Sequence, residues 1–447
     1  MMLKKYKLHE VATFELSNVD KKSKDGEQSV RLCNFTDVYY NWAVTRNMER
    51  SFMLATASES QIKKLAIQKG QVAITKDSET RHDIGIPTYI ADDLENTVLG
   101  YHCALITPDQ SKVDGRFLNA FLNSKMAKEY FANNASGSGM RYSLPVDAIK
   151  NILLYLPELE VQKRIGHLLS IIDRKIALNR EINRNLEAMA RQLYDYWFVQ
   201  FDFPDENGKP YKSSGGKMVW NEKLKREIPA DWGVCRLGDY VIANNTGDWG
   251  YASESDGKTL RVGCIRGADI VKLNDLPIRY LNNGNHSKLL NNWNIVIEVS
   301  GGSPVQATGR SAYITPGVIE RNGGKITCSN FCHAFTIRNQ CDSAFFYYSW
   351  QSLYDNGNMF NFEGKTSGIK NFMAETFLTI KWPDIPQKVS TQFFAVIESI
   401  HAKIDSNITE NNSLTALRDE LLPLLINGQV SIRPTSVNCD LAVEMAA

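Results

Sequence analysis

The stretch LEVQKRIGHLLSIIDRKIALNREINRNLEAMARQLYDYWF (residues 159–198) decides the fold of this chain, because its pattern returns 228 residues later. The second copy is IPQKVSTQFFAVIESIHAKIDSNITENNSLTALRDELLPLLING (residues 385–428). When Asn179 is aligned with Asn407, apolar residues fall on apolar residues along both stretches. The matched pairs are Leu169 with Ile397, Ile172 with Ile400, Ile176 with Ile404, Leu186 with Leu414 and Leu193 with Leu421. A repeat of this length predicts two domain-sized copies, each closed by the same long helix.

Both stretches also carry a seven-residue apolar rhythm, which is typical of a coiled coil. The first heptad position holds Ile165, Ile172, Asn179, Leu186 and Leu193 in the first stretch, and Phe393, Ile400, Asn407, Leu414 and Leu421 in the second. The other position holds Leu168, Ile182 and Met189, and in the second stretch Val396 and Leu417. An Asn at a seam position favours one register over others, because only that register pairs its amide. The alternative is that Asn179 and Asn407 lie on solvated faces.

Composition limits the class of protein. The chain has 447 residues, too many for one hydrophobic core, and its net charge is +1. A near-neutral chain that binds nucleic acid must gather its basic residues on one face or share the task with a partner. No run of about 18 apolar residues occurs and the N-terminus lacks a signal-peptide core, so we expect a cytoplasmic protein that does not enter membranes. Its eight cysteines suggest no disulfide framework.

The blocks before each long stretch read as mixed domains built to one plan. VAIT (72–75) and YHCALIT (101–107) predict strands, residues 114–132 predict one amphipathic helix, and residues 133–145 predict a Gly/Ser loop. Matching segments in the second copy are NIVIEV (294–299), FCHAFTI (331–337), residues 345–356 and residues 364–377. The order of elements favours α+β domains.

No motif of the sequence indicates catalysis. Gly364-Lys365-Thr366 lacks the earlier glycine of a phosphate loop. Cys328, Cys332, His333 and Cys341 do not have zinc-knuckle spacing, and a buried strand with small thiols explains them better. We therefore predict no metal site, no cofactor and no catalytic residues.

The Gly-rich loops are better candidates for contacts with DNA, because small residues let a backbone approach phosphates that nearby cations can bind. The candidate DNA-binding residues are Arg141, Lys365 and Lys370, followed by Arg266 and Arg310. For each of them a solvated surface charge in an ordinary turn is the alternative.

Taken together, these features resemble the specificity (S) subunit of type I restriction–modification systems. The resemblance rests on five features that recur in order along nearly the whole chain. They are the entries LPEL (156–159) and WPDI (382–385), RKIALN (174–179), WFVQFDF (197–203), the restart IP…WG…LGD (228–239) and the ending LLPLLING (421–428).

The resemblance implies two tandem target-recognition domains, each followed by a long helix, with the two helices forming an antiparallel coiled coil. The expected segments are domain 1 (1–157), helix 1 (158–199), a connector (200–229), domain 2 (230–382), helix 2 (383–430) and a tail (431–447). It also implies a non-catalytic subunit that reads a bipartite site in double-stranded DNA, one half with each domain. Two methyltransferase subunits, which bring S-adenosylmethionine, and restriction/translocase subunits are the implied partners. Two other classes stay open: a coiled-coil scaffold that binds no nucleic acid, and a two-lobed DNA-modifying enzyme.

Overall fold

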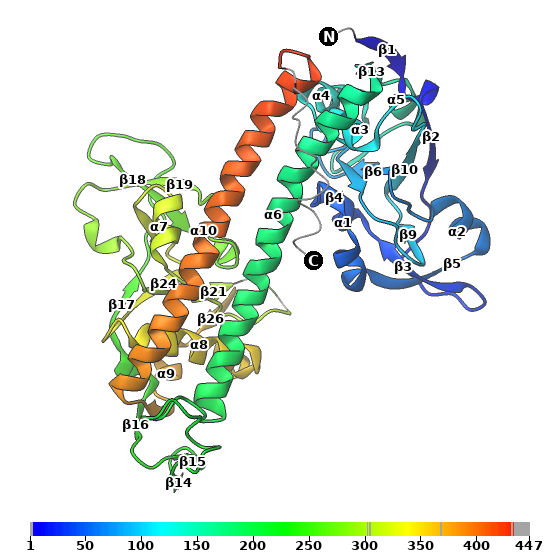
Figure 1. Ribbon diagram of the computed structural model, residues 1–447. Helices are drawn as coiled ribbons and strands as arrows, with labels where there is room; N and C mark the ends of the chain where they lie inside the picture. The colour runs from blue at the N-terminus through cyan, green and yellow to red at the C-terminus, as the bar shows by residue number, and fades with distance from the viewer. Residues whose placement is uncertain (1–2, 302, 304, 367–368, 431, 433–447) are drawn as a thin grey trace. The chain divides into compact units, whose positions relative to one another are not determined.

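The computed structural model describes residues 3–301, 303, 305–366, 369–430 and 432, with the backbone alone for Lys365 and Thr366 (Figure 1). Contacts divide the chain into two compact units. Unit 1 comprises Met1–Leu178 with Asn411–Ala447, and unit 2 comprises Asn179–Glu410. Each unit therefore contains one mixed α/β domain and about half of each long helix. The boundaries of the six segments expected from the sequence remain a prediction.

Unit 1 is built around a five-stranded sheet of order β2-β10-β6-β8-β4. Smaller sheets have the orders β5-β3-β9 and β11-β12-β7, and β1 pairs with β13. The strands are β1 (Lys4–Lys7), β2 (Ala12–Leu16), β3 (Gln28–Cys33), β4 (Ala43–Val44), β5 (Met53–Ala57), β6 (Val72–Thr75), β7 (Asp77–Ser78), β8 (Pro87–Ile90), β9 (Thr97–Leu99), β10 (Cys103–Pro108), β11 (Ser136–Ser138), β12 (Arg141–Ser143) and β13 (Leu153–Leu156). The short helices are α1 (Phe35–Tyr39), α2 (Glu59–Leu65), α3 (Gly115–Leu122), α4 (Lys125–Asn134) and α5 (Val146–Asn151).

Unit 2 contains sheets of order β17-β24-β20-β22, β19-β18-β23 and β21-β26-β25, with the pairs β16-β27 and β14-β15. Its strands are β14 (Met218–Asn221), β15 (Arg226–Pro229), β16 (Gly233–Arg236), β17 (Val241–Thr246), β18 (Leu260–Ile265), β19 (Ile278–Leu281), β20 (Ile295–Glu298), β21 (Ser300–Gly301), β22 (Ser311–Tyr313), β23 (Ile326–Cys328), β24 (Cys332–Ile337), β25 (Glu363–Thr366), β26 (Ile369–Phe372) and β27 (Lys381–Asp384). Its short helices are α7 (Pro316–Arg321), α8 (Asp342–Asp355) and α9 (Ala374–Phe377).

The two sets of sheets correspond strand by strand, so the repeat seen in the sequence is a repeat of topology. The order β2-β10-β6-β8 corresponds to β17-β24-β20-β22. In the smaller sheets, β3 pairs in parallel with β9 as β18 pairs with β23. The register also corresponds, because Cys103 pairs with Thr75 where Cys332 pairs with Glu298 at the end of the same two strands. The strands expected near residues 72–75, 101–107, 294–299 and 331–337 are present.

Two expectations in the first domain need correction. The single helix expected over residues 114–132 is two helices, because α3 ends at Leu122 and α4 begins at Lys125. Ser124 accepts a hydrogen bond from the backbone N–H of Ala127 and so starts the second helix as its N-cap. The Gly/Ser stretch expected as a loop contains the hairpin β11-β12.

The long helices are α6 (Leu159–Tyr194) and α10 (Gln387–Ile426), and they form an antiparallel coiled coil. In unit 2, Tyr194 lies against Phe393 with ring centroids 6.5 Å apart, and Asn183 contacts Ile404 and Asn407. As residue numbers rise along α6, the residue numbers of its partners in α10 fall, so the two helices run antiparallel. In unit 1, Ile165 and Leu169 of α6 share a core with Leu422, Leu425 and Ile426 of α10.

The seam uses one of the two expected heptad positions. Ile165, Ile172, Ile400, Asn179 and Asn407 are buried, and both Asn side chains are 1 % exposed, which excludes a solvated position for them. At the second expected position Leu168 and Ile182 are partly buried, and Leu168 packs against the core of unit 1. The expectation is wrong for the other three, because Met189 is 47 % exposed, Val396 41 % and Leu417 44 %. The seam alternates steps of four and three residues, so the other buried positions are Leu169, Ile176, Asn183 and Ala190, with Ile397 and Ile404 in α10. Residues i+3 and i+4 lie on the same side of a helix, and packing alone decides which of them is covered.

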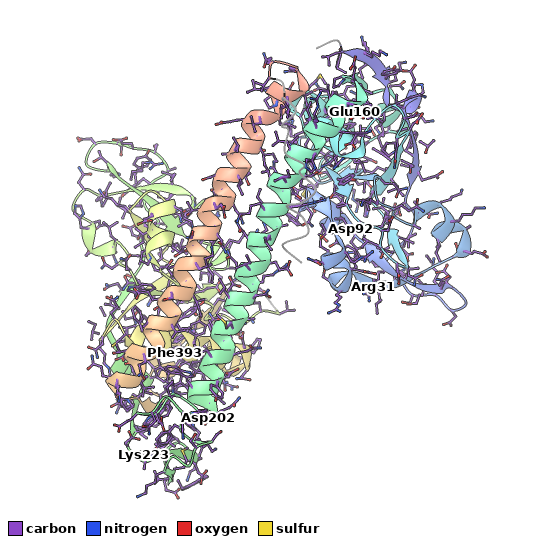
Figure 2. All side chains as sticks on the ribbon, in the orientation of Figure 1. Arg31, Asp92, Glu160, Asp202, Lys223 and Phe393 are labelled. Carbon is purple, nitrogen blue, oxygen red and sulfur yellow. The ribbon has the colours of Figure 1, made fainter. Side chains whose placement is uncertain are left out.

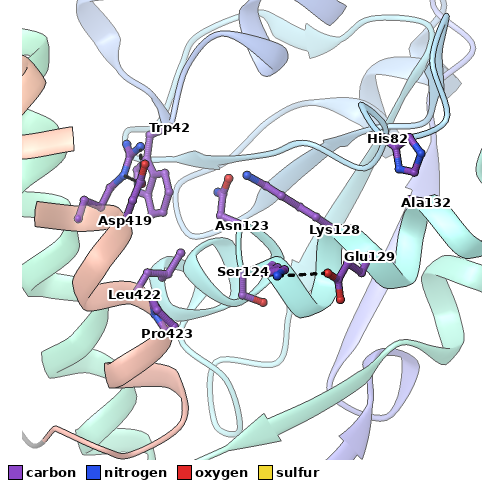
Figure 3. A pocket seen from close by; sticks show the side chains of 12 residues that line it. Trp42, His82, Asn123, Ser124, Lys128, Glu129, Ala132, Asp419, Leu422 and Pro423 are labelled. Atoms are coloured by element: carbon purple, nitrogen blue, oxygen red, sulfur yellow. Dashed lines mark hydrogen bonds and ion pairs between the residues drawn. The ribbon is translucent and has the colours of Figure 1, made fainter. Parts of the chain in front are cut away.

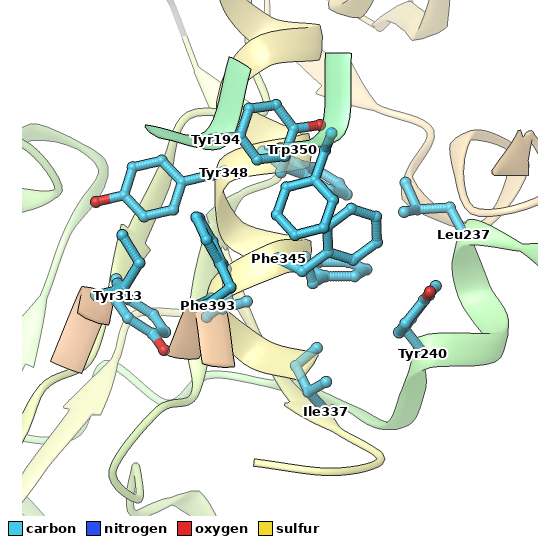
Figure 4. Packing of buried hydrophobic residues seen from close by; sticks show 14 of the residues in the cluster. Tyr194, Leu237, Tyr240, Tyr313, Ile337, Phe345, Tyr348, Trp350 and Phe393 are labelled. Carbon is cyan, nitrogen blue, oxygen red and sulfur yellow. The ribbon is translucent and has the colours of Figure 1, made fainter. Parts of the chain in front are cut away.

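At its C-terminal end α6 passes into an aromatic core within unit 2. A π-helical turn (Asp195–Val199) follows Tyr194, and it directs Trp197 and Phe198 inward. The ring of Phe198 lies 4.7 Å from that of Phe345 on α8 and 4.9 Å from that of Phe393 on α10. Figure 4 shows Phe345 and Phe393 in this core together with Tyr194 and Tyr348. Asp202, labelled in Figure 2, follows in the connector. It accepts hydrogen bonds from the backbone N–H and the hydroxyl of Ser213. These contacts fix the end of the helix to the second domain.

Candidate nucleic-acid interface

A hairpin stands at one edge of the first domain. Strands β11 and β12 pair from Ser136 with Ser143 to Ser138 with Arg141, and β12 continues the pairing to β7. Gly137 has φ +129° and a Cβ there would lie 2.1 Å from the carbonyl oxygen of Arg141, so this strand requires glycine. Arg141 is exposed, and Met140 in the turn is 76 % exposed. An exposed cation at the tip of a two-stranded ribbon has access to a phosphate backbone.

A hollow of about 900 Å³ opens beside this hairpin and contains Arg141 in its wall. Five aromatic rings also line it, together with one imidazole and two half-buried aspartates. They are Phe35, Tyr39, Tyr40, Tyr101, Tyr142, His102, Asp77 and Asp83. Tyr40 is 68 % exposed and Tyr101 48 %. Large exposed aromatic groups next to a cation are a surface suited to nucleic acid.

Hydrogen bonds fix the polar groups of the hollow. His102 Nδ1 lies 2.7 Å from Asp77 Oδ2, and the hydroxyl of Tyr39 donates to Asp83 Oδ2 at 2.5 Å. Burial by itself would raise the pKa of Asp77, but hydrogen bonds from Ser143 and His102 and the nearby Lys76 ammonium outweigh it, and the pKa is lowered. The hydrogen bond to Asp83 raises the pKa of Tyr39 to about 12. The Asp77 carboxylate is thus an ionised hydrogen-bond acceptor at neutral pH, and Asp83 accepts the hydrogen bond from Tyr39.

The second domain has the same three-stranded arrangement with different side chains. Strands β25 and β26 pair from Glu363 with Phe372 to Thr366 with Ile369, and β26 pairs with β21. The adjoining hollow is smaller, about 310 Å³. Its polar lining is Asn244, Ser300, His333, Asn371 and Glu375. His333 Nδ1 lies 2.8 Å from Asn244 Oδ1, and burial lowers the pKa of His333, which keeps this imidazole neutral.

The five candidate cations lie in different settings. Arg141 is exposed at its hairpin, and Lys365 lies in β25 with a side chain outside the described part of the chain. Lys370 pairs with Glu363 at 3.1 Å and its side chain is only 14 % exposed. Arg310 makes two hydrogen bonds, of 2.8 and 2.7 Å, to buried Glu298, and Arg266 makes two to Asp269. The hydrogen bonds to Glu298 raise the pKa of Arg310 further.

The structure therefore brings only Arg141 of these five into the large hollow. A guanidinium already paired bidentately must leave its carboxylate before it can bind a phosphate, so Arg310 and Arg266 are less suited to that role than Arg141. The role of each of the five in binding DNA remains a prediction.

Sequence reasoning did not find the pairs His102–Asp77 and Tyr39–Asp83. The partners are 25 and 44 residues apart, and no local spacing marks them. A weak signal is the polar Tyr101-His102 directly before a buried strand, in a turn where His102 has φ +72°. A non-glycine residue in the left-handed region indicates a turn whose surroundings determine its shape.

The expectation of buried thiols in strands is confirmed for Cys328 and Cys332, whereas Cys341 is partly buried and lies directly before α8. Cys328 and Cys332 are buried on β23 and β24, and burial raises the pKa of Cys332 to about 12. Within the described residues no group of three His, Cys, Asp or Glu side chains could hold a metal ion. None of the helices in that part of the chain is long and apolar enough to cross a membrane.

A second pocket of about 530 Å³ lies in unit 1, where the last turns of α10 meet α4 (Figure 3). Trp42, Leu422 and Pro423 give it an apolar wall, and the guanidinium of Arg418 lies 4.4 Å from the centre of the Trp42 ring. Lys125 and Glu129 pair at its other side, with N and O atoms 3.8 Å apart. One wall is apolar and the other is charged, which is more typical of a protein contact than of a small-molecule site.

Comparison with known proteins agrees with this architecture. Residues 3–188 match the family model of the type I restriction modification DNA specificity domain. A "Type I restriction enzyme HindI specificity subunit" from Haemophilus influenzae is 35 % identical over 140 residues, which is 31 % of this chain and 30 % of that protein. A "Type I restriction enzyme MjaIX specificity subunit" from Methanocaldococcus jannaschii is 24 % identical over 330 residues, 72 % of this chain and 70 % of that protein.

A solved structure extends the likeness of fold to nearly the full length. The S subunit of a type I restriction-modification system from M. genitalium superposes with a TM-score of 0.53 at 15 % identity, and 97 % of each chain is covered. At this identity the likeness concerns the fold alone. The matched domain model and these relatives are thus similar to parts of the chain, and its two α/β domains with an antiparallel coiled coil have the fold of a type I restriction–modification specificity (S) subunit.

Proposed function

We propose that this chain is the DNA-recognition subunit of a type I restriction–modification complex and that each domain reads one half of a bipartite site in double-stranded DNA. The observation that carries the proposal is the pair of hollows beside corresponding hairpins. The hairpins have the same strand register, yet the positions paired across them differ: Asp77 pairs with Ser143 in one, and Ser300 with Asn371 in the other. One strand arrangement that carries two different sets of hydrogen-bonding side chains suits two domains that recognise different DNA sequences.

The proposed partners are two methyltransferase subunits held by the long helices, and restriction/translocase subunits in the complete assembly. Apolar side chains left outside the seam support a protein partner. In unit 1 these are Ile171, Leu178 and Leu417, which are 44 to 50 % exposed, and in unit 2 they are Met189 and Val396. Apolar residues repeated along an exposed helical face are typical of a contact surface. In this proposal the chain supplies recognition, and its partners supply catalysis.

Methylation-site sequencing tests the proposal directly. Cells that carry this gene with its methyltransferase partner should methylate one bipartite motif. Replacement of residues 230–382 by the corresponding domain of a relative should change one half of that motif and leave the other half intact, because domain 1 still makes its own base contacts. A swap that altered both halves would contradict independent reading by the two domains.

The two other classes predict different results. A scaffold protein would give no shift of cognate DNA in a gel, even together with the methyltransferase. A two-lobed enzyme would methylate or cut DNA as the purified chain alone. The paired hollows favour the recognition subunit over both.

A further inference from the structure

The large hollow of domain 1 contains an imidazole that is held rigidly and turned toward solvent. His102 precedes β10 in a left-handed turn, and its carbonyl accepts a hydrogen bond of 2.7 Å from the backbone N–H of Lys76. The neighbouring Tyr101 donates its N–H to the carbonyl of Val19 at 2.8 Å, and its ring lies 4.1 Å from the imidazole. The side chain of His102 is nevertheless 51 % exposed. Position and orientation are thus fixed while one edge of the ring remains accessible.

Asp77 determines which edge of the His102 ring remains accessible. Its Oδ2 lies 2.7 Å from His102 Nδ1, and an ionised carboxylate can only accept a hydrogen bond, so Nδ1 carries the proton. In the neutral imidazole Nε2 is then an acceptor. Within the part of the chain that the structure describes, no hydrogen bond or ion pair reaches Nε2. The Asp77 carboxylate is itself held by Lys76, whose Nζ is 3.2 Å from Oδ2.

The charges around the hollow favour a base over a phosphate as its ligand. Three carboxylates, those of Asp77, Glu79 and Asp83, line the wall and would repel a phosphate there, while the wall contains one guanidinium, that of Arg141. Cations lie over aromatic rings instead: Lys76 Nζ is 5.7 Å from the centre of the Tyr101 ring, and the Arg81 guanidinium is 5.7 Å from that of Tyr142. Carboxylates therefore outnumber cations in the wall, and a ligand that donates hydrogen bonds matches them.

We propose that this hollow is the base-reading site of domain 1 and that His102 Nε2 accepts a hydrogen bond from the exocyclic amino group of a cytosine or an adenine in the major groove. The proposal rests on the proposed function. Cytosine N4 and adenine N6 are the donors that bases present in that groove, and a two-stranded ribbon such as β11-β12 fits into it. Asp77 is a positioning residue that acts through the imidazole, and Arg141 at the hairpin tip is placed for the adjacent phosphate.

The second domain lacks this pair and so offers a matched control. Because Cys332 occupies the place of Cys103 in the strand register, Phe331 takes the place of His102, and Ser300 takes that of Asp77. Phe331 is 52 % exposed. A change at Phe331 should act on the other half-site only.

The experiment uses the full chain with its methyltransferase partner. Methylation motifs are determined for the wild type, His102→Ala, Asp77→Asn, Phe331→Ala and His9→Ala, the last a surface control whose ring contacts the Lys150 carbonyl. Affinities for cognate and unrelated duplexes are measured over a range of salt concentrations. His102→Ala should lose the preference for cytosine or adenine at one position of one half-site. It should weaken cognate binding about 5- to 150-fold and leave unrelated DNA unaffected.

Asp77→Asn should relax the same position, and the double variant should add little to either single one, because both act through one hydrogen bond. A purely structural role would lower thermal stability without changing the preferred base. Weakening that is equal for all sequences would mean a phosphate contact and would overturn the inference, as would an unchanged motif. If the wild type produced no bipartite motif, the proposed function itself would fail and the inference with it.

Discussion

The side-chain amide of Asn407 donates a hydrogen bond of 2.7 Å to the side-chain oxygen of Asn183, inside the seam between α10 and α6. Asn407 is 1 % exposed and Asn183 9 %. Asn183 also donates to the carbonyl of Ile404 at 3.3 Å, and Asn179 donates to Glu410 at 2.7 Å. The middle of the coiled coil is thus a polar layer in which each of these side-chain amides donates to an acceptor on the other helix. Such a layer selects a register, because a shifted helix would leave these groups unpaired.

Replacement of Asn407 by Leu should destabilise the chain by about 1 to 3 kcal/mol, since it leaves the buried oxygen of Asn183 without this donor. The double variant Asn183→Leu with Asn407→Leu should recover most of the loss and broaden the choice of register. Chemical denaturation of the purified variants measures this, with exposed Asn185→Ala as the control. Equal stability of Asn407→Leu and the wild type would show that the pair contributes nothing.

Asp405 of α10 should be a far more sensitive position than an exposed carboxylate. Its Oδ1 lies 2.6 Å from Arg321 Nη1, its Oδ2 accepts from Thr315 at 2.6 Å, and the Arg321 side chain is 7 % exposed. Asp405→Asn leaves a buried guanidinium without its anion, which should cost about 3 to 5 kcal/mol of stability. Glu222→Gln, from the exposed pair with Lys225, should cost less than about 1 kcal/mol in the same assay.

Stability should fall in mild acid because of His401. Burial lowers the pKa of this imidazole to about 4, and the hydroxyl of Tyr348 lies 3.1 Å from its Nε2. The unfolded chain takes up the proton near pH 6.5 and the folded chain only near pH 4. The free energy of unfolding should thus decrease as the pH falls between these values, by up to about 3 kcal/mol. His401→Gln should remove that part of the pH dependence, and a variant that keeps the full slope would assign it elsewhere.

Arg141 and Arg310 should respond differently to substitution by Ala. Arg141 is exposed at a hairpin tip, so its loss should weaken binding to all DNA sequences alike and reduce the salt slope by about one. Arg310→Ala leaves buried Glu298 unpaired, so it should lower thermal stability more than it lowers the affinity for DNA. Binding titrations at several salt concentrations, with melting curves alongside, separate the two effects. Unchanged affinity and slope in Arg141→Ala would remove that residue from the interface.

Lengthening the coil should lengthen the gap in the recognised site. One added heptad in α6 and one in α10 extend the helices by about 10 Å, or about three base pairs. Methylation-site sequencing should show both half-sites unchanged with more base pairs between them. Activity should be weaker, because the added heptads also change the rotation of one domain relative to the other about the DNA axis. A gap that stayed the same would show that the helices do not set it.

Much of the fold follows from patterns that sequence displays directly. The repeat, the two long helices and the seam position of Asn179 and Asn407 depend on periodicity, which is local and regular. The break between α3 and α4 depends on one capping serine inside an apolar pattern, and the choice between Met189 and Ala190 for the seam depends on the partner helix. The pairs His102–Asp77 and Tyr39–Asp83 depend on strands meeting across the sheet, so no window of sequence contains them.

The shared register of the two hairpins also bears on how new specificities arise. Each hairpin is one short segment of the chain, residues 136–143 in the first domain and 363–372 in the second, with the same strand register and different side chains. Recombination or gene conversion between the two halves of this gene, or with a related gene, can therefore exchange such a segment without disturbing the hydrophobic core beneath it. Diversification of the target can then proceed in small steps within a half-site, in addition to the replacement of whole domains.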